Sequence, residues 1–344
     1  MNSDGKDNFL NTDLLWQMYS VMHRIRISEE RIADLVTAGE IKTPCHFYIG
    51  QEAVAAGVCL ALQKNDYVWT AHRSHGHYLA KGGNLASMLA EIYGKRTGCS
   101  KGRGGSMHLL AAEVGILGTV PLLSATIPLA VGAGLASKLR HDGRVSVSFF
   151  GDGATAEGHF HESLNLAAIY KLPVIFVCEN NLYQCHMHIQ EYLSEGDIYK
   201  SGDAHGIPGI VVDGNDVIAV HKAALEAVRR ARAGEGPTLL ECKTFRWRGH
   251  VGPSTDIDVG IRRRDDVCEW LPKDPIPPVM KRLLDLGATE ADFDRIAEET
   301  LAELDQAVEY SRRSPYPAKH ELLEHVFYSG AQSRAEGMTF PVAN

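Results

Sequence analysis

Apolar residues recur every three or four positions over residues 11–39, and this spacing predicts an amphipathic helix near the start of the chain. Residues 51–63 and 84–93 predict two further helices, and residues 66–70 predict a short strand. The stretch 98–106 contains four glycines and predicts a loop. We expect this first part of the chain to be mainly helical.

From residue 127 onward, continuous apolar runs alternate with helical periods. Such runs are typical of strands in a parallel sheet that is covered on both faces. The pattern predicts an α/β fold with a doubly wound, mainly parallel sheet. The strands are expected at residues 145–150, 172–179, 209–214 and 238–247, with helices at 127–140, 157–170 and 216–233.

The pattern changes after residue 250. Residues 250–267 have no apolar period and predict a surface loop, whereas residues 289–312 predict a charged amphipathic helix. Residues 315–318 should end that helix before a last short one. We therefore divide the chain into an α/β domain with its N-terminal helix, residues 1–255, and a loop and helical C-terminal extension, residues 256–344, which is not an independent domain.

Composition narrows the class of protein. The chain has 344 residues, of which 44% are hydrophobic and 23% charged, and these values exclude a disordered or fibrous protein. A net charge of −8 does not suggest a non-specific nucleic-acid binder. No apolar run reaches about 18 residues, and the polar first residues resemble neither a secretory signal nor a transit peptide. We expect a cytoplasmic protein that binds neither nucleic acid nor membrane.

The cysteines are seven in number, and none forms a Cys-X-X-Cys pair. This pattern favours reduced thiols over disulfides or a zinc site. A metal site built from Cys178 and Cys185 would need His186 and His188 at an unusual spacing, so we do not expect one.

The strongest chemical signal is a pair of motifs that follow two consecutive predicted strands. Gly151-Asp152-Gly153 follows the first strand, and Asn180-Asn181 follows the second. A right-handed crossover brings the carboxyl ends of such strands to one edge of the sheet, so Asp152 and Asn181 should lie side by side. A carboxylate and an amide oxygen suit Mg²⁺, and Gly153 with the following helix suits a phosphate. The motifs therefore predict a site for a metal-bound diphosphate.

A dinucleotide-binding loop is the main alternative. Its Gly-X-Gly-X-X-Gly fingerprint would need a third glycine where this chain has Ala156. Asp152 would also repel a pyrophosphate unless a cation lay between them. Glu179 ends the next strand and could hold a ribose, so this alternative stays open. A phosphate-binding P-loop is excluded because the chain lacks its signature.

The paired motifs resemble the thiamine diphosphate motif. More narrowly, the chain resembles the α subunit of the decarboxylating first component of 2-oxo acid dehydrogenase complexes. The segments that carry this resemblance are residues 46–53, 70–76, 101–108, 206–214, 245–250 and 274–276.

The resemblance implies roles for the residues around the diphosphate. Asp152, Asn181 and the carbonyl of Tyr183 would hold Mg²⁺. Arg73 would grip the diphosphate, a task that suits a guanidinium fork. His72 would also contact the cofactor, at a position where pyruvate-type enzymes usually have tyrosine.

The same resemblance implies contacts along the rest of the cofactor. Gly153 and Ala154 would contribute backbone contacts, and Leu123 would lie under the bend of the cofactor. His46 matches a histidine of the substrate entrance, and His250 matches one near the diphosphate and the reacting carbon. His46 and His250 are therefore the implied catalytic residues.

The implied activity is that of a thiamine diphosphate- and Mg²⁺-dependent 2-oxo acid dehydrogenase, with pyruvate as the first candidate substrate. The enzyme would decarboxylate the substrate and pass the acyl group to a lipoyl arm. The family's activating glutamate lies in a separate pyrimidine-binding domain, and this chain is too short to contain one. The resemblance therefore implies a partner β subunit in an α2β2 assembly, and a lipoyl acyltransferase as a further partner.

Three alternatives remain for the activity: the α subunit of an acetoin dehydrogenase, a subunit of a biosynthetic thiamine-dependent carboligase or decarboxylase, and a non-catalytic paralogue. Val251 stands where eukaryotic pyruvate-type subunits have a regulatory serine, so we do not expect that control here. The arginines at 262–264 are most simply a solvated loop face; the alternative is that they order the loop after His250 over the cofactor.

Overall fold

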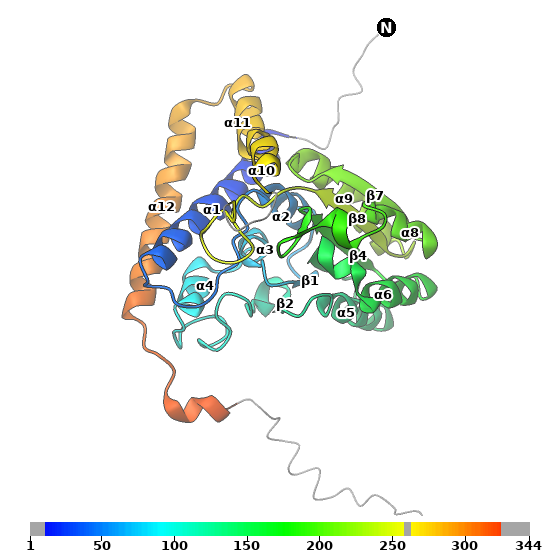
Figure 1. Cartoon of the computed structure of the whole chain (residues 1–344), viewed down its shortest axis with the longest axis horizontal. Coiled ribbons are helices and arrows are strands. Elements are labelled where there is room, and N and C mark those ends of the chain that lie inside the picture. Colours follow the sequence, from blue (N-terminus) through cyan, green and yellow to red (C-terminus); the bar gives the residue numbers. More distant parts are fainter. Residues whose placement is uncertain (1–10, 258–262, 325–344) are drawn as a thin grey trace, which may run out of the picture.

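A six-stranded, all-parallel sheet forms the centre of the molecule in the computed structural model, which describes residues 11–257 and 263–324 (Figure 1). The strand order β2-β1-β3-β4-β8-β7 confirms the predicted doubly wound α/β fold. The strands are β1 (Tyr67–Thr70), β2 (Ile116–Thr119), β3 (Ser146–Gly151), β4 (Val174–Asn180), β7 (Gly209–Asp213) and β8 (Thr238–Lys243). A two-stranded antiparallel ribbon, β5 (Tyr183–Gln184) and β6 (Met187–His188), follows β4.

Helices cover both faces of the sheet because alternate residues of the central strands face opposite sides. Phe149 and Val177 join one apolar cluster, whereas Phe150 and Phe176 join the other. The first cluster also contains residues of α1 (Thr12–Thr37), α2 (Glu52–Cys59), α4 (Leu85–Ile92) and α9 (Val217–Arg232), and the second those of α5 (Thr126–Arg140) and α6 (Gly158–Ile169).

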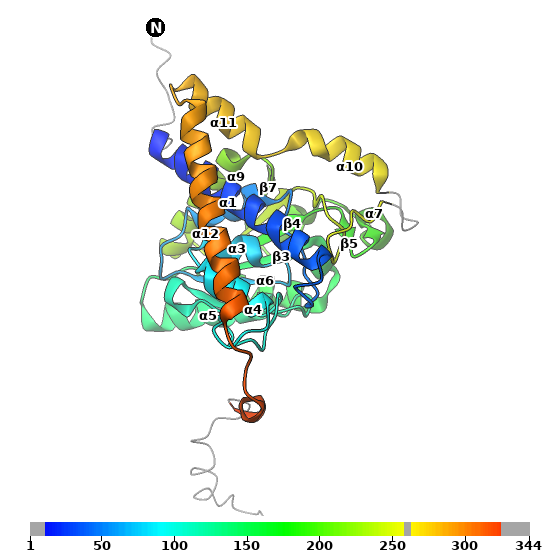
Figure 2. The same cartoon turned by 90° about the vertical axis from the view of Figure 1, so that its left-hand side faces the viewer.

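The C-terminal helices pack on the N-terminal half of the chain. Helix α12 (Glu290–Arg313) crosses α1 and reaches α4, and its residue Leu304 lies in the same apolar cluster as Ile25 (Figure 2). Helix α11 (Ile276–Asp285) packs on α1 through Val279. Two prolines in its first turn obscure this helix in the sequence, although proline is favoured there.

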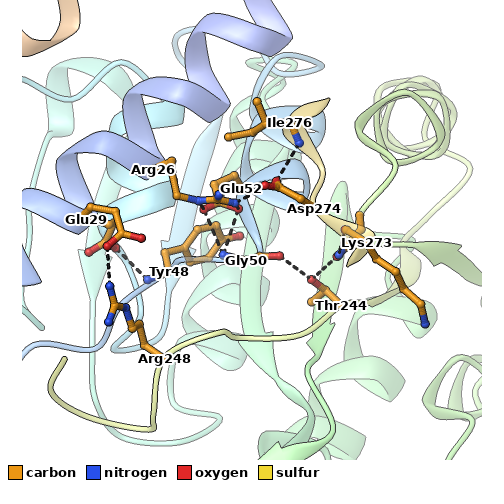
Figure 3. Close-up of polar contacts among 12 residues, drawn as sticks. Arg26, Glu29, Tyr48, Gly50, Glu52, Thr244, Arg248, Lys273, Asp274 and Ile276 are labelled. Atoms are coloured by element: carbon orange, nitrogen blue, oxygen red, sulfur yellow. Dashed lines mark hydrogen bonds and ion pairs between the residues drawn. The ribbon is translucent and has the colours of Figure 1, made fainter. Parts of the chain in front are cut away.

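A charged contact holds the segment just before α11 against α1 and α2 (Figure 3). The Arg26 guanidinium of α1 donates to both oxygens of the buried Glu52 at 2.5 and 3.0 Å, and to Asp274 at 3.2 and 3.3 Å. Asp274 also accepts a hydrogen bond from the backbone N–H of Ile276. The segment 274–276 therefore anchors the C-terminal helices to α1 and α2, far in sequence from it.

The described part of residues 250–267 differs from the predicted surface loop in two ways. Helix α10 (Arg264–Trp270) begins inside the predicted loop. Arg263 is fully buried rather than solvated, and its guanidinium donates to the backbone carbonyls of Arg246 and Thr255. Arg262 lies outside the described residues.

Several short elements were not predicted, or differ in length. Strand β2 and helix α3 (His75–Ala80) have too few residues to show a period, and β8 ends four residues before the predicted limit. The expected last helix is a 3-10 turn at Lys319–Leu323. The remaining short helices are α7 (Ile189–Tyr192) and α8 (Ser201–Ala204). Among the described helices, none combines the length and apolarity needed to cross a membrane.

Candidate active site

A cavity of about 250 Å³ lies where strands β1, β3 and β4 end. This is the edge at which doubly wound sheets bind ligands. All the site residues proposed from the sequence line this one cavity: His46, His72, Arg73, Leu123, Asp152, Gly153, Ala154, Asn181, Tyr183 and His250. The cavity also involves residues to which the sequence analysis gave no role in this site, chiefly Arg246, Gln184 and Cys185.

Asp152 and Asn181 meet as the strand connection predicted. The backbone N–H of Asn181 donates to Oδ1 of Asp152 at 3.4 Å, and the hydroxyl of Tyr192 donates to Oδ2. Burial raises the pKa of the Asp152 carboxyl above its usual value. This carboxylate is therefore a buried charge that a cation would stabilise.

Asn181 offers a second oxygen beside that carboxylate. Its side-chain N–H donates to Oε1 of Gln51 at 2.9 Å, which fixes the orientation of the amide. Its Oδ1 is buried and has no hydrogen-bond partner within the described part of the chain. A buried acceptor without a donor is costly, and a hard cation would satisfy it. The pair thus fits a magnesium ion.

The turn at Gly153 brings the backbone close to the β5–β6 ribbon. A Cβ atom at residue 153 would lie 2.8 Å from Cγ of Gln184, so this position is restricted to glycine unless Gln184 moves. Leu182 and Cys185 both have a positive φ, which reflects the sharp turns of the ribbon. The ribbon therefore forms a close wall opposite Asp152 and Ala154.

Arg73 is a buried cation that two backbone carbonyls hold in place. Its guanidinium donates to the carbonyl of Phe47 at 2.5 Å and to that of His250 at 3.2 Å. Burial lowers its pKa to about 9, while the carboxylates of Glu179 and Glu29 act in the opposite direction. An anion entering the cavity would compensate this charge.

Glu179, the residue that the dinucleotide alternative would assign to a ribose, takes part in a buried hydrogen-bond network. Its carboxylate accepts hydrogen bonds from the hydroxyl of Tyr48 and from Nε2 of His77, the latter at 3.0 Å. The Nδ1 atom of His77 in turn lies 2.8 Å from the hydroxyl of Thr70. One oxygen of Glu179 is thus already engaged in a buried network.

Three imidazoles gather at the cavity. His46, His72 and His250 have ring centroids 4.5, 5.1 and 5.3 Å apart in pairs. Burial, with Arg73 as the next cause, lowers the pKa of His46 and His250 to about 3 and that of His72 to about 2. All three rings are therefore neutral near pH 7.

The segment that carries His250 is fixed by charged side chains. Asp256 accepts hydrogen bonds from the backbone N–H of His250 at 2.8 Å and from Nε2 of His186 at 3.2 Å. A Cβ atom at Gly249 would lie 2.3 Å from this carboxylate, so glycine makes room for it. Arg246 contacts Nδ1 of His250 at 3.3 Å and donates to the carbonyl of Cys185.

Three further residues show contacts that the sequence pattern does not reveal. Arg246 is buried and belongs to the segment 245–250, which carries part of the family resemblance. In the structure it joins His250 to the ribbon. Tyr192 gave no sequence signal, because its contact with Asp152 depends on the ribbon's path. His75 does not line the cavity; its ring bridges Glu29 and Ser106 at 3.1 and 2.8 Å.

The chain is similar to known proteins over most of its length. Residues 20–320 match the family described as dehydrogenase E1 component. The chain is 42% identical over 320 residues to the alpha subunit of acetoin:2,6-dichlorophenolindophenol oxidoreductase of Bacillus subtilis, covering 92% of this chain and 93% of that one. It is 40% identical over 321 residues to the chloroplastic pyruvate dehydrogenase E1 component subunit alpha-3 of Oryza sativa subsp. japonica, covering 90% and 75%. It is also 40% identical over 314 residues to the pyruvate dehydrogenase E1 component subunit alpha of Zymomonas mobilis, covering 91% and 88%.

Proposed function

Because this chain belongs to the dehydrogenase E1 component family, whose alpha subunits are parts of thiamine diphosphate-dependent oxidoreductases, we propose that it binds thiamine diphosphate and Mg²⁺. We propose further that it acts on a 2-oxo acid, pyruvate first, by decarboxylating it and passing the acyl group to a lipoyl acceptor. The observation that carries this proposal is the buried oxygen of Asn181 beside the Asp152 carboxylate, which has no hydrogen-bond partner among the residues described.

The residues at the strand ends suit the diphosphate and its metal. Asp152 and Asn181, with the carbonyl of Tyr183, would hold Mg²⁺, and Arg73 would neutralise the phosphate charge. Gly153 and Ala154 would give backbone contacts in the turn that follows. When bound, the cofactor supplies a nucleophilic carbon and an electron sink for decarboxylation.

The histidines and Leu123 suit the other end of the cavity. A neutral His46 or His250 can donate one N–H to a carbonyl oxygen or accept a proton at its other ring nitrogen. His72 would donate a hydrogen bond to the cofactor. Leu123 gives the wall an apolar surface on which the bend of the cofactor would rest.

The proposal requires a second subunit. The alpha-subunit names of the relatives imply a partner, and the sheet in the described residues is a single α/β unit. We propose a β subunit that supplies the pyrimidine-binding domain and its activating glutamate, in an α2β2 assembly. A lipoyl acyltransferase would take the acyl group. Alone, this chain would have half a site and little turnover.

Acetoin is the second candidate substrate. His72 stands where pyruvate-type enzymes usually have tyrosine, and it lies within the histidine cluster. The Bacillus subtilis relative, which is named for acetoin, matches over nearly its whole length. Steady-state assays of the assembled α and β subunits with pyruvate and with acetoin will separate the two, since the true substrate should have the higher kcat/KM.

Calorimetric titration tests the cofactor proposal directly. We expect thiamine diphosphate to bind the assembled enzyme only with Mg²⁺, and Asp152→Ala to weaken binding by at least about tenfold because a metal ligand is lost. Asp203→Ala removes an exposed carboxylate from α8 and serves as the matched control. Equal affinity in the two variants would contradict the metal assignment, and no binding to the wild type would contradict the proposed function.

A further inference from the structure

His46, His72 and His250 come from three separate segments, yet their rings lie close together in the cavity, in edge-to-face pairs. Each offers one ring nitrogen such that the three atoms lie within 4.8 Å of one another. We propose that these three imidazoles form a binding site for a divalent transition-metal ion of the Zn²⁺ class. This site is distinct in its ligands from the magnesium site at Asp152 and Asn181.

The spacing of the rings suits such an ion. In a tetrahedral site with Zn–N bonds of about 2.0–2.1 Å, the centroids of three imidazoles lie roughly 5 Å apart. The observed centroids are 4.5, 5.1 and 5.3 Å apart, and the ring planes are inclined by 60 to 83°. Small side-chain rotations would therefore bring the nitrogens to bonding distance without moving the backbone.

The ligand chemistry selects the type of metal. Three nitrogen ligands without a carboxylate favour Zn²⁺, Co²⁺ or Cu²⁺ over Mg²⁺. The rings are neutral near pH 7, so each has one unprotonated nitrogen that can bind the ion. In His250 the guanidinium of Arg246 faces Nδ1 at 3.3 Å, so the metal would have to replace this contact. Nδ1 of His46 is buried and has no partner among the residues that the structure describes.

Two cationic side chains near the three histidines should determine which ligand fills the fourth coordination position of the metal ion. The guanidinium groups of Arg73 and Arg246 line the same cavity and lower the pKa of the imidazoles. They oppose the charge of a bare dication, so the open position of the metal should be filled by an anion such as hydroxide or chloride. We expect moderate rather than tight binding for this reason.

A regulatory consequence follows if the proposed function holds. His72 and His250 are proposed cofactor contacts, so the metal and thiamine diphosphate would exclude one another. Free Zn²⁺ would then keep the chain from loading its cofactor. This competition rests on the proposed function, whereas metal binding by the three histidines does not.

Cobalt provides a spectroscopic probe of the site. The test is a titration of the full chain, without cofactor, with Co²⁺, followed by the visible absorption that tetrahedral coordination produces. Zn²⁺ is then added to displace the Co²⁺. We expect an intense tetrahedral band in the wild type. His46→Asn and His72→Tyr should each weaken Co²⁺ binding by at least about tenfold, because each removes one of three ligands.

The control variant is His108→Gln, which removes an exposed histidine outside the cavity and should leave the band unchanged. Circular dichroism of each variant verifies that the fold is retained. Co²⁺ affinity that is equal in the wild type and in both cavity variants would overturn the metal site. A band that depends on the histidines would support it whatever the outcome with the cofactor.

Addition of thiamine diphosphate with Mg²⁺ to the cobalt-loaded chain and its β subunit tests the competition. Loss of the band on cofactor binding supports mutual exclusion. Retention of a histidine-dependent band while the cofactor binds would overturn the exclusion but leave the metal site. If the cofactor does not bind even the metal-free enzyme, the proposed function fails and the cobalt titration still decides the metal site.

Discussion

At the scale of single residues, Arg73 shows how geometry limits substitution. Lysine would keep a positive charge but would lose the planar fork, whose two separate nitrogens donate to the carbonyls of Phe47 and His250. We expect Arg73→Lys to weaken thiamine diphosphate binding by about tenfold or more while the protein stays folded. Titration calorimetry and thermal unfolding of the variant measure the two effects, and wild-type affinity would make Arg73 a purely structural residue.

His250 should matter more to turnover than to cofactor affinity. Its ring lies beside His46 and His72, whereas its backbone N–H and carbonyl are engaged by Asp256 and Arg73. His250→Ala keeps these backbone contacts and removes one donor or proton carrier, which is worth about 10²–10⁴-fold in rate. We expect kcat of the assembled enzyme to fall by this amount with a small change in cofactor affinity. A near-normal kcat would exclude a catalytic role.

The metal-binding part of the candidate site could be predicted from the pattern of strands, whereas the other site residues followed only from the family resemblance. Asp152 and Asn181 follow buried apolar runs, and strand connection rules bring such residues together. The residues that hydrogen-bond to Asp152 and Asn181 and orient them could not be predicted. Gln51 and Tyr192 reach the pair from a helix N-terminus and a short helix whose positions depend on tertiary packing.

At the scale of elements, the glycine-rich loop 98–106 is organised around one carboxylate. Glu91, fully buried at the end of α4, accepts hydrogen bonds from the backbone N–H groups of Ser100 and Gly102 through Oε2, and of Gly104 and Gly105 through Oε1. These four bonds explain how a segment with few apolar side chains adopts one conformation.

Glu91→Gln should therefore destabilise the protein. The amide NH₂ would face backbone donors, so about 2–4 kcal/mol of the free energy of unfolding should be lost. Chemical denaturation measures the change, with Glu113→Gln as an exposed control. A loss below about 1 kcal/mol would mean that the loop holds its shape without the carboxylate.

The long helices and strands could be predicted from the period of apolar residues in the sequence, whereas the short elements could not. Helices α1 and α9 have clear amphipathic patterns, and strands β3 and β4 have continuous apolar runs. Arg263 shows the limit: its polar neighbours suggested solvent, yet its guanidinium is buried against backbone carbonyls and the ring of Phe245. Charge alone cannot indicate which arginine a fold will enclose.

At the scale of the whole molecule, all seven cysteines are free thiols, as expected, and they differ widely in exposure. Burial raises the pKa of Cys45 and Cys59 to about 12, and it also raises the pKa of Cys178 and Cys242 well above the usual value. Thiolates are the reactive species, so these four should resist alkylation at neutral pH.

Brief iodoacetamide treatment of the native chain at pH 7.5, followed by peptide mass spectrometry, should therefore label the exposed Cys185 and Cys268 first. Denaturation should make the other thiols reactive. Because Cys185 lines the cavity, thiamine diphosphate with Mg²⁺ should protect it in the enzyme assembled with its β subunit. Cys268 in the same sample should stay reactive and serves as an internal control. Rapid labelling of Cys45 or Cys59 in the native state would contradict the packing described for them.

The strand order has a consequence for how the chain is made. Strand β8 lies between β4 and β7, although β7 precedes it in sequence. While a ribosome synthesises the 24 residues between β7 and β8, β7 has no strand to pair with, and β4 exposes an apolar edge. Exposed edges of this kind recruit other chains. We therefore expect the nascent protein to be most prone to aggregation during this interval. The exposure ends when β8 pairs with β4 and β7.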